Sequence, residues 1–329
     1  MSELQVAVVG AGFMGRAHAH SYTKGGGLAH VAFIVDADEE RGRALAGSMP
    51  YPVRAVTELG QVLKDSAIDI VDICVPTALH RSLVIEAAQA GKNVICEKPI
   101  APTLEDADAM IQACAESGVL FMVAHVIRFW PEYVTAVEMV ERGDIGSLRR
   151  ITCQRLSSPP TWARDQWIQN TSLSGGAVRD LAIHDFDFIR CLIGTPENIH
   201  AQGDLMHFTS LFGKADCLAS VEASYSMPVG FPFVMNFRLV GESGVIEFDG
   251  TGGAVRLVRK GEVQRIPVCG SRTFTQQDVD EEVDAYFHEI AYFVECVKTG
   301  QTPTRVTSQD AREALSMALG IERILGGGK

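Results

Sequence analysis

The stretch that decides the fold is Val6-Ala7-Val8-Val9-Gly10-Ala11-Gly12-Phe13-Met14-Gly15. Its apolar start predicts a short buried strand, and GxGxxG follows at once, ahead of a segment with helical apolar spacing from Gly15 to Thr23. In such a loop the first glycine permits a tight turn, the second lets the backbone approach a pyrophosphate, and the third allows close packing of helix on sheet. Free N–H groups at the helix start bind the anion. We therefore expect a dinucleotide-binding loop made of Gly10, Gly12, Phe13, Met14 and Gly15.

The same alternation of strand and helix continues through residues 1–125, which predicts an α/β Rossmann domain, a doubly wound parallel sheet covered on both faces. The expected strands are Val6 to Val9, Ala32 to Val35, Ile70 to Val75, Asn93 to Cys96 and Leu120 to Ala124. The expected helices are Gly15 to Thr23, Glu39 to Ser48, Thr57 to Asp65, Leu79 to Ala90 and Leu104 to Ser117.

The second predicted strand ends at Asp36, about 20 residues beyond Gly15, where a carboxylate accepts hydrogen bonds from ribose hydroxyls. A carboxylate there repels a 2′-phosphate, and Arg41 stands a helical turn further along. We therefore expect NAD as cofactor, with NADP disfavoured. A purely structural reading of Asp36 or Asp38 is a helix N-cap.

Residues 126–307 have a different pattern and predict an α+β domain with an open, mostly antiparallel sheet. The expected strands are Leu148 to Leu156, Ile199 to Phe208, Cys217 to Ser226, Val234 to Val240, Gly244 to Phe248 and Ala254 to Arg259. Helices are expected at Pro131 to Arg142, Ala177 to Ile193, Asp280 to Lys298 and Ser308 to Leu325.

Composition narrows the class of protein. The chain has 329 residues, 47% hydrophobic and 21% charged, which indicates a globular protein with more than one domain. Its net charge of −12 disfavours nucleic acid and anionic membranes as partners. The 8 cysteines are dispersed without metal-ligand spacing, so we expect reduced thiols and no metal. With no signal-peptide pattern at Met1 to Val9, we expect a cytoplasmic protein.

Three side chains suggest acid/base chemistry. Lys98, in Glu97-Lys98-Pro99, follows the fifth predicted strand, and residues at carboxyl ends of parallel strands face the ligand crevice. Asp180 and His184 follow Gly175-Gly176 at a helical spacing that places them on one face, where the carboxylate can orient the imidazole. The alternatives are a solvated lysine, a structural Asp-His pair or a metal site. Proline could also make the Lys98-Pro99 bond cis.

The segment Ser157 to Ser174 holds candidate substrate contacts. Trp162 and Trp167 could stack on the apolar face of a sugar ring, and Arg155 could bind its hydroxyls with Arg164 and Asp165. Tryptophan in a loop also serves as a packing anchor, which is the alternative.

These motifs resemble the glucose-fructose oxidoreductase, inositol dehydrogenase and rhizopine catabolism (Gfo/Idh/MocA) family over nearly the whole chain. The resemblance rests on Gly10 to Gly15, Asp36, Pro76-Thr77-Ala78-Leu79-His80, Glu97-Lys98-Pro99, His125, Arg128-Phe129-x-Pro131 and Asp180-x3-His184 after paired glycines. It implies NAD-dependent hydride transfer to or from a cyclic sugar or polyol, with Lys98, Asp180 and His184 as the catalytic set. It also implies cofactor contacts from Pro76, Thr77, His80 and Glu97, and substrate contacts from His125 and Arg128. The last helix, about 308–325, is implied to pack back on the first domain.

Three other functions stay open at this stage: an NAD-dependent glycosidase acting by transient oxidation, a non-catalytic regulator that binds sugar and NAD, and a Schiff-base lyase that uses Lys98 as nucleophile. We also expect a homodimer or homotetramer formed through the second domain's sheet. The sequence places Phe233, Met235 and Phe237 in one register of a strand, and we expect this register on the outer, subunit-facing side.

Overall fold

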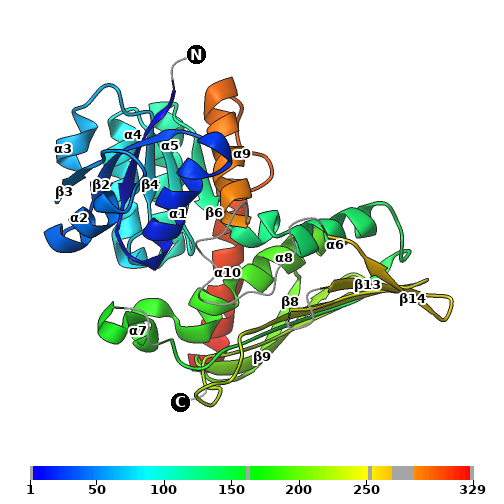
Figure 1. Ribbon diagram of the computed structural model, residues 1–329. Helices are drawn as coiled ribbons and strands as arrows, with labels where there is room; N and C mark the ends of the chain where they lie inside the picture. The colour runs from blue at the N-terminus through cyan, green and yellow to red at the C-terminus, as the bar shows by residue number, and fades with distance from the viewer. Residues whose placement is uncertain (1–2, 161–163, 251–253, 269–284, 327–329) are drawn as a thin grey trace. The chain divides into compact units, whose positions relative to one another are not determined.

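The computed structural model describes residues 3–160, 164–250, 254–268 and 285–326 (Figure 1). The chain divides into two compact units: unit 1 comprises Met1–Phe129 and Val279–Arg312, and unit 2 comprises Trp130–Asp278 and Glu313–Lys329. The boundary falls inside α10 (Ser308–Gly326), so only the first turn of this helix groups with unit 1. The C-terminal helix that lies wholly in unit 1 is α9 (Ala285–Thr299).

Unit 1 contains a six-stranded sheet of order β3-β2-β1-β4-β5-β6 in which every pairing is parallel. This confirms the doubly wound parallel sheet. The strand order reverses between β1 and β4, and ligands bind at such a switch point, outside the carboxyl ends of the strands. The strands are β1 (Gln5–Val9), β2 (His30–Val35), β3 (Arg54–Val56), β4 (Ile70–Ile73), β5 (Asn93–Glu97) and β6 (Phe121–Ala124).

The helices of unit 1 begin and end where the sequence supplies capping groups. Asp38 accepts a hydrogen bond from the backbone N–H of Arg41, and Thr103 accepts one from that of Asp106. Gly118 ends a helix in the left-handed conformation. The α-helices are α1 (Phe13–Thr23), α2 (Glu39–Gly47), α3 (Gly60–Leu63), α4 (His80–Gln89), α5 (Leu104–Ser117) and α9, with 3-10 turns η1 (Lys24–Gly26), η2 (Thr77–Leu79) and η3 (Val126–Phe129).

Unit 2 contains an eight-stranded sheet of order β14-β13-β12-β11-β7-β10-β9-β8. Only β7 and β10 pair in parallel, which confirms the mostly antiparallel prediction. The single strand expected from Ile199 to Phe208 is two strands, and β14 was not predicted because its residues are nearly all exposed. The strands are β7 (Leu148–Leu156), β8 (Asn198–Gly203), β9 (His207–Lys214), β10 (Cys217–Ser224), β11 (Val234–Gly241), β12 (Val245–Asp249), β13 (Ala254–Arg259) and β14 (Glu262–Ile266).

Helices of unit 2 pack on one face of this sheet (Figure 1). Tyr133 makes edge contacts with Phe188, Phe237 and Phe248, so an aromatic cluster fills the space between helices and strands. The expected helix from Ala177 to Ile193 is split into a π-helix and an α-helix. The elements are α6 (Pro131–Glu141), η4 (Arg164–Gln169), α7 (Thr171–Ser174), η5 (Ala177–Leu181), α8 (Ile183–Ile193) and the rest of α10.

The other face of the sheet is polar. Gln154 donates to Glu222 and accepts from Asn236, and both arginines Arg238 and Arg256 bond to Glu247. The prediction that the register of Met235 and Phe237 lies on this outer face is wrong. Both side chains are buried, and Phe237 packs against Tyr133 and Phe188, because the apolar register of β11 faces the helices.

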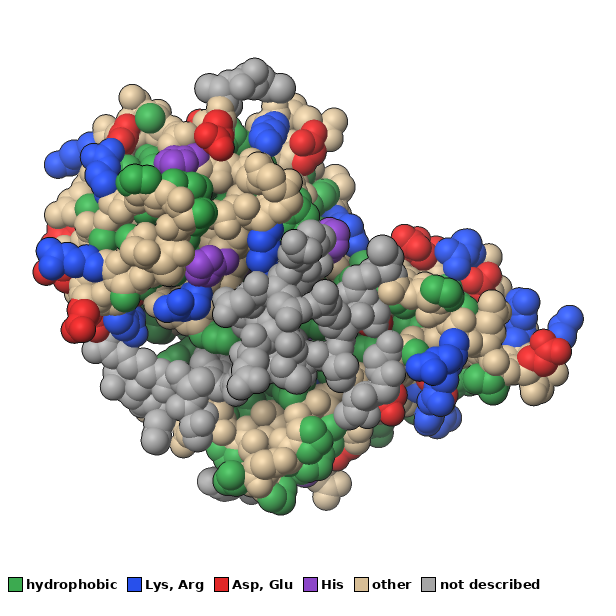
Figure 2. All heavy atoms as spheres, in the orientation of Figure 1, with side chains coloured by type: hydrophobic (Ala, Val, Ile, Leu, Met, Phe, Trp, Pro, Cys, Tyr) green, Lys and Arg blue, Asp and Glu red, His purple; other side chains and the backbone are tan. Residues whose placement is uncertain are grey.

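On the visible face in Figure 2, Lys and Arg side chains are interspersed with Asp and Glu side chains. Among the helices that the structure describes, none combines the length and the apolar character needed to span a membrane.

Candidate functional site

The glycine loop of unit 1 has the geometry that its sequence predicts. Gly10 has φ +102°, and a Cβ there would meet the carbonyl oxygen of Cys74 at 2.3 Å. A Cβ on Gly15 would lie 1.7 Å from the carbonyl oxygen of Gly10, so only glycine lets the helix pass this close to the loop. A Cβ on Gly12, in contrast, would meet nothing within 4 Å.

The backbone at Gly12 is open to the approach of a pyrophosphate. Gly12 is the N-cap of α1 and makes no side-chain cap, so Phe13 and Met14 in the first turn present backbone N–H groups at a positive helix end. Pro76 and Thr77 lie at the carboxyl end of the adjacent β4, on the switch-point side of the sheet. These residues are the ones that would hold the pyrophosphate.

Asp36 follows β2 at the same edge of the sheet. Its Oδ2 accepts a hydrogen bond from the N–H of Ala11 at 2.7 Å, so the carboxylate is anchored to the glycine loop. The structure adds a partner that the sequence argument set aside: Arg41 Nη2 lies 2.9 Å from Asp36 Oδ2. The side chain of Asp38, not Asp36, caps α2.

His80 does not fit the expected contact with the cofactor. The imidazole is fully buried, with Nε2 2.9 Å from the carbonyl oxygen of Val75 and Nδ1 3.0 Å from that of Pro99. Burial lowers its pKa, and the backbone carbonyls oppose that shift. Since both ring nitrogens face backbone oxygens, His80 ties the loop after β4 to the loop after β5 and has no edge for a ligand.

Lys98 lies directly after β5, at the carboxyl edge of the sheet, and its bond to Pro99 is cis. Its side chain is half-buried. Glu97, expected to contact the cofactor, instead points into unit 1: its Oε2 accepts the backbone N–H of Lys98 at 2.9 Å, and its Oε1 lies 3.2 Å from His18 Nε2. Its role is therefore internal, because both carboxylate oxygens face protein groups.

Two predicted substrate contacts, His125 and Arg128, follow β6, and they differ in burial. His125 is fully buried, which removes it from direct contact with a substrate in this structure. Arg128 is half-buried, and its Nη1 lies 3.4 Å from the carbonyl oxygen of Arg305. Arg305 in turn lies over the ring of Phe129.

In unit 2, the paired glycines shape the start of η5. Gly176 has φ +61°, and a Cβ there would lie 2.3 Å from the carbonyl oxygen of Leu205. Asp180 is buried in η5, and the hydroxyl of Tyr225 donates to its Oδ2 at 2.5 Å. His184 is half-buried in the first turn of α8. Burial, together with the Asp180 charge, raises the pKa of Tyr225, so this hydroxyl stays protonated and donates.

Tyr225 was not singled out from the sequence. It directly follows β10, at one end of the sheet, and its position after a strand was the available signal.

Arg155, expected to bind substrate hydroxyls, has a structural role instead. Its Nε lies 2.8 Å from Asp185 Oδ2 and its Nη2 3.0 Å from Asp185 Oδ1, and both side chains are buried. Nη2 also lies 3.3 Å from the hydroxyl of Tyr133. Burial works to lower the pKa of Arg155, but Asp185, together with Tyr133 and Cys153, raises it by more. The guanidinium of Arg155 therefore binds Asp185 of α8.

The remaining predicted substrate contacts lie in the segment before α7. Trp167 is half-buried in η4, whereas Trp162 lies outside the described residues, as do the side chains of Arg164 and Asp165. The predicted triad is divided between the units, with Lys98 in unit 1 and Asp180 and His184 in unit 2.

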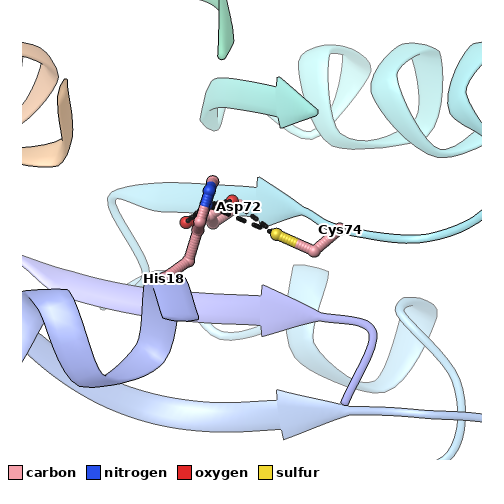
Figure 3. Close-up of side chains that lie close together, drawn as sticks. All are labelled: His18, Asp72 and Cys74. Atoms are coloured by element: carbon pink, nitrogen blue, oxygen red, sulfur yellow. Dashed lines mark hydrogen bonds and ion pairs between the residues drawn. The ribbon is translucent and has the colours of Figure 1, made fainter. Parts of the chain in front are cut away.

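A cluster that the sequence did not reveal lies inside unit 1 (Figure 3). His18 Nδ1 is 3.0 Å from Asp72 Oδ2, and Cys74 Sγ is 3.3 Å from Asp72 Oδ1. Burial works to lower the pKa of His18. The opposing effects of Asp72 and Cys74 are larger in sum, so the pKa lies well above its ordinary value. Burial raises the pKa of the Cys74 thiol and of the Tyr22 hydroxyl. These residues were missed because they look like ordinary positions of a helix and a strand.

The parallel sheet of unit 1 and its glycine loop are typical of the class of NAD-binding oxidoreductases. Residues 4–125 match the oxidoreductase family with an NAD-binding Rossmann fold, and residues 133–256 match the GFO/IDH/MocA C-terminal domain. The chain belongs to the Gfo/Idh/MocA family of oxidoreductases, which confirms the resemblance and NAD as the cofactor.

Several relatives are similar over most of their length. The chain is 29% identical to scyllo-inositol 2-dehydrogenase (NAD(+)) of Bacillus subtilis, over 97% of this chain and 92% of that protein. It is 28% identical to myo-inositol 2-dehydrogenase of Thermotoga maritima, over 98% and 96%. It is 30% identical to D-apiose dehydrogenase of Paraburkholderia graminis, over 82% and 71%.

A solved structure supports the fold. Levoglucosan dehydrogenase, in complex with NADH and levoglucosan, aligns with a TM-score of 0.85 at 22% identity, covering 100% of this chain and 98% of that one.

Gly12→Ala and Gly15→Ala form a matched pair that separates cofactor binding from folding. Gly12 has φ −78° and space for a methyl group, so its variant should keep wild-type stability and lose NAD affinity by about tenfold or more, or about 1.4 kcal/mol. The Gly15 variant should lose about 1–3 kcal/mol of stability, because its methyl group overlaps the Gly10 carbonyl. Thermal unfolding and NAD titration measure both. Normal NAD affinity in Gly12→Ala would contradict the loop assignment.

Asp185→Leu should destabilise the protein by about 3–5 kcal/mol, because it leaves the Arg155 charge buried without its partner. The double variant Arg155→Met/Asp185→Leu should recover a large part of that loss, since it removes both charges. Denaturant unfolding gives the free energies. A double variant less stable than Asp185→Leu would show that the guanidinium has another essential partner.

Proposed function

We propose that this oxidoreductase transfers a hydride between a secondary alcohol carbon of a cyclic sugar or polyol and NAD. The observation that carries the proposal is the position of Lys98, a cation directly after β5 at the same sheet edge as the Gly12 loop. The names of the relatives support the substrate class, since they act on inositols and apiose.

The residues divide the chemistry as follows. Neutral His184 removes the proton of the substrate hydroxyl, a step suited to an imidazole near neutral pH. Lys98 stabilises the charge that develops on the same oxygen. Asp180, held by Tyr225, orients His184. When bound, NAD supplies the hydride acceptor. In the reverse direction His184 returns the proton.

Substrate recognition is proposed to involve half-buried groups. Arg128 and Trp167 are such residues, the first as a donor to hydroxyls and the second as a flat apolar surface. Arg155 is excluded from this role by its pairing with Asp185.

His184→Ala should lower kcat by about 10²- to 10⁴-fold, the usual contribution of a positioned acid/base group. NAD affinity should stay unchanged, because the nucleotide loop lies in unit 1. Asp180→Asn acts through His184, so combining the two substitutions should add little further loss. The assay follows NADH formation with inositols and aldoses as substrates.

Lys98→Ala is the second test variant of this series, and it should also lose turnover while remaining folded. Near-normal turnover by folded His184→Ala would mean that another group takes the proton.

Cofactor choice should depend on Asp36 and Arg41. Wild type should prefer NAD, because the Asp36 carboxylate repels a 2′-phosphate. Asp36→Ser should narrow the NAD/NADP preference by about tenfold or more, since it also releases the Arg41 guanidinium to bind that phosphate. The double variant Asp36→Ser/Arg41→Ala should use NADP less well than Asp36→Ser. Steady-state kinetics with both cofactors measure this, and NADP preference in wild type would refute it.

A homodimer or homotetramer formed through the sheet of unit 2 is proposed as the working assembly. Exposed apolar side chains lie among the polar pairs on the outer face of this sheet, and they include Leu211 at 42% and Leu218 at 41%. Leu211→Glu/Leu218→Glu should therefore shift the protein toward monomer, because buried unpaired carboxylates oppose association. Light scattering at micromolar concentration tests it, and a wild-type monomer would refute the proposal.

A cytoplasmic location is proposed as well. The described residues include 7 free cysteines, most of them buried, as suits a reducing compartment.

A further inference from the structure

Unit 1 contains a chain of contacts that leads from α1 to the backbone of Lys98. His18 is fully buried between two carboxylates: Nδ1 is 3.0 Å from both oxygens of Asp72, and Nε2 is 3.2 Å from Glu97 Oε1. The other oxygen of Glu97 accepts the N–H of Lys98 at 2.9 Å. The three elements α1, β4 and β5 are thus joined at one imidazole, and Figure 3 shows its contact with Asp72 of β4.

The protonation state of His18 follows from its neighbours. Nδ1 meets Asp72 in hydrogen-bond geometry, whereas Nε2 meets Glu97 at ion-pair distance without a hydrogen bond. An imidazolium carries the positive charge that both buried carboxylates need nearby, and a neutral imidazole does not. Asp72 has two additional donors, Tyr22 Oη at 3.1 Å and Cys74 Sγ at 3.3 Å. Glu97 Oε1, in contrast, faces only His18 among the contacts of the described residues. The raised pKa of His18 agrees with the charged form.

We propose that His18 is a positioning residue, an imidazolium that bridges Asp72 and Glu97 and thereby fixes the backbone of Lys98 at the carboxyl edge of the sheet. This inference rests on the proposed function, because that function gives Lys98 its role at the substrate oxygen. Its consequence is that a residue with no exposed atoms controls turnover.

A metal ion is the competing occupant of this cluster. The ligand atoms of His18, Asp72 and Cys74 are close enough together to hold one. A metal-bound cysteine must be a thiolate, whereas here the Cys74 thiol donates a hydrogen bond from Sγ to Asp72 Oδ1 at 3.3 Å. The contacts are those of a proton-sharing network.

The first test compares His18→Asn with His18→Gln. The amide nitrogen of asparagine takes the place of Nδ1 and donates to Asp72, whereas that of glutamine takes the place of Nε2 and donates to Glu97. His18→Asn should lower kcat by about 10- to 100-fold with NAD affinity near wild type, since a small displacement of Lys98 misplaces its charge. His18→Gln should retain more turnover than His18→Asn. His20→Gln, on the same helix, is the matched control and should equal wild type.

The outcomes separate the two proposals. Equal losses in His18→Asn and His18→Gln, or normal turnover in His18→Asn while Lys98→Ala is inactive, would overturn the positioning role and leave the proposed function standing. Normal turnover by folded Lys98→Ala would overturn the proposed function itself.

The second test needs no variant at position 18 to fold. Nitrogen NMR of the ring of His18 in the wild-type protein should show both nitrogens protonated at mildly alkaline pH, and Glu97→Gln should lower the pH at which the ring loses its proton. A ring with one protonated nitrogen throughout, or stoichiometric zinc in the purified protein, would contradict the inference.

Discussion

The structure of unit 1 depends on one constraint, that parallel strands all end at the same edge of their sheet. The residues after β1, β2, β4 and β5 are therefore collected at one edge although they lie far apart in sequence. They include the Gly12 loop, Asp36, Thr77 and Lys98. The close approach of Gly15 to Gly10 brings the N-terminus of α1 to this edge as well. Nucleotide binding and Lys98, the cation with a proposed catalytic role, can thus share one surface.

Buried charges follow a common rule in both units. Arg155 is paired through two hydrogen bonds with Asp185, and His18 lies between Asp72 and Glu97. In each case a cation inside the protein fixes an element that bears a residue with a proposed role: α8 contains His184, and β5 leads to Lys98. Removing one partner leaves a buried charge without compensation and destabilises the protein. Such pairs therefore keep the elements that carry them in a fixed position.

The sequence was most informative where backbone geometry demands a particular residue. Glycines at 10 and 15 predicted the loop correctly because a Cβ at either position would overlap backbone atoms, whereas Gly12 has open space beside it. Polar side chains were harder, since a sequence does not show their partners. Arg155 looked like a surface donor and is buried, and His80 looked like a ligand contact and binds backbone carbonyls. The alternation of apolar and polar residues in β11 predicted a strand, but it did not show on which face of the sheet Phe237 lies.

The most direct test of the central claim is the stoichiometry of NADH formed to substrate consumed. A cyclic polyol or sugar that the protein oxidises is incubated with excess NAD, and NADH and the ketone or lactone product are quantified together. The account predicts equal amounts of both, with the hydride of the substrate's alcohol carbon recovered in NADH after isotopic labelling. Consumption of substrate without NADH accumulation, as in transient oxidation followed by re-reduction, would contradict it.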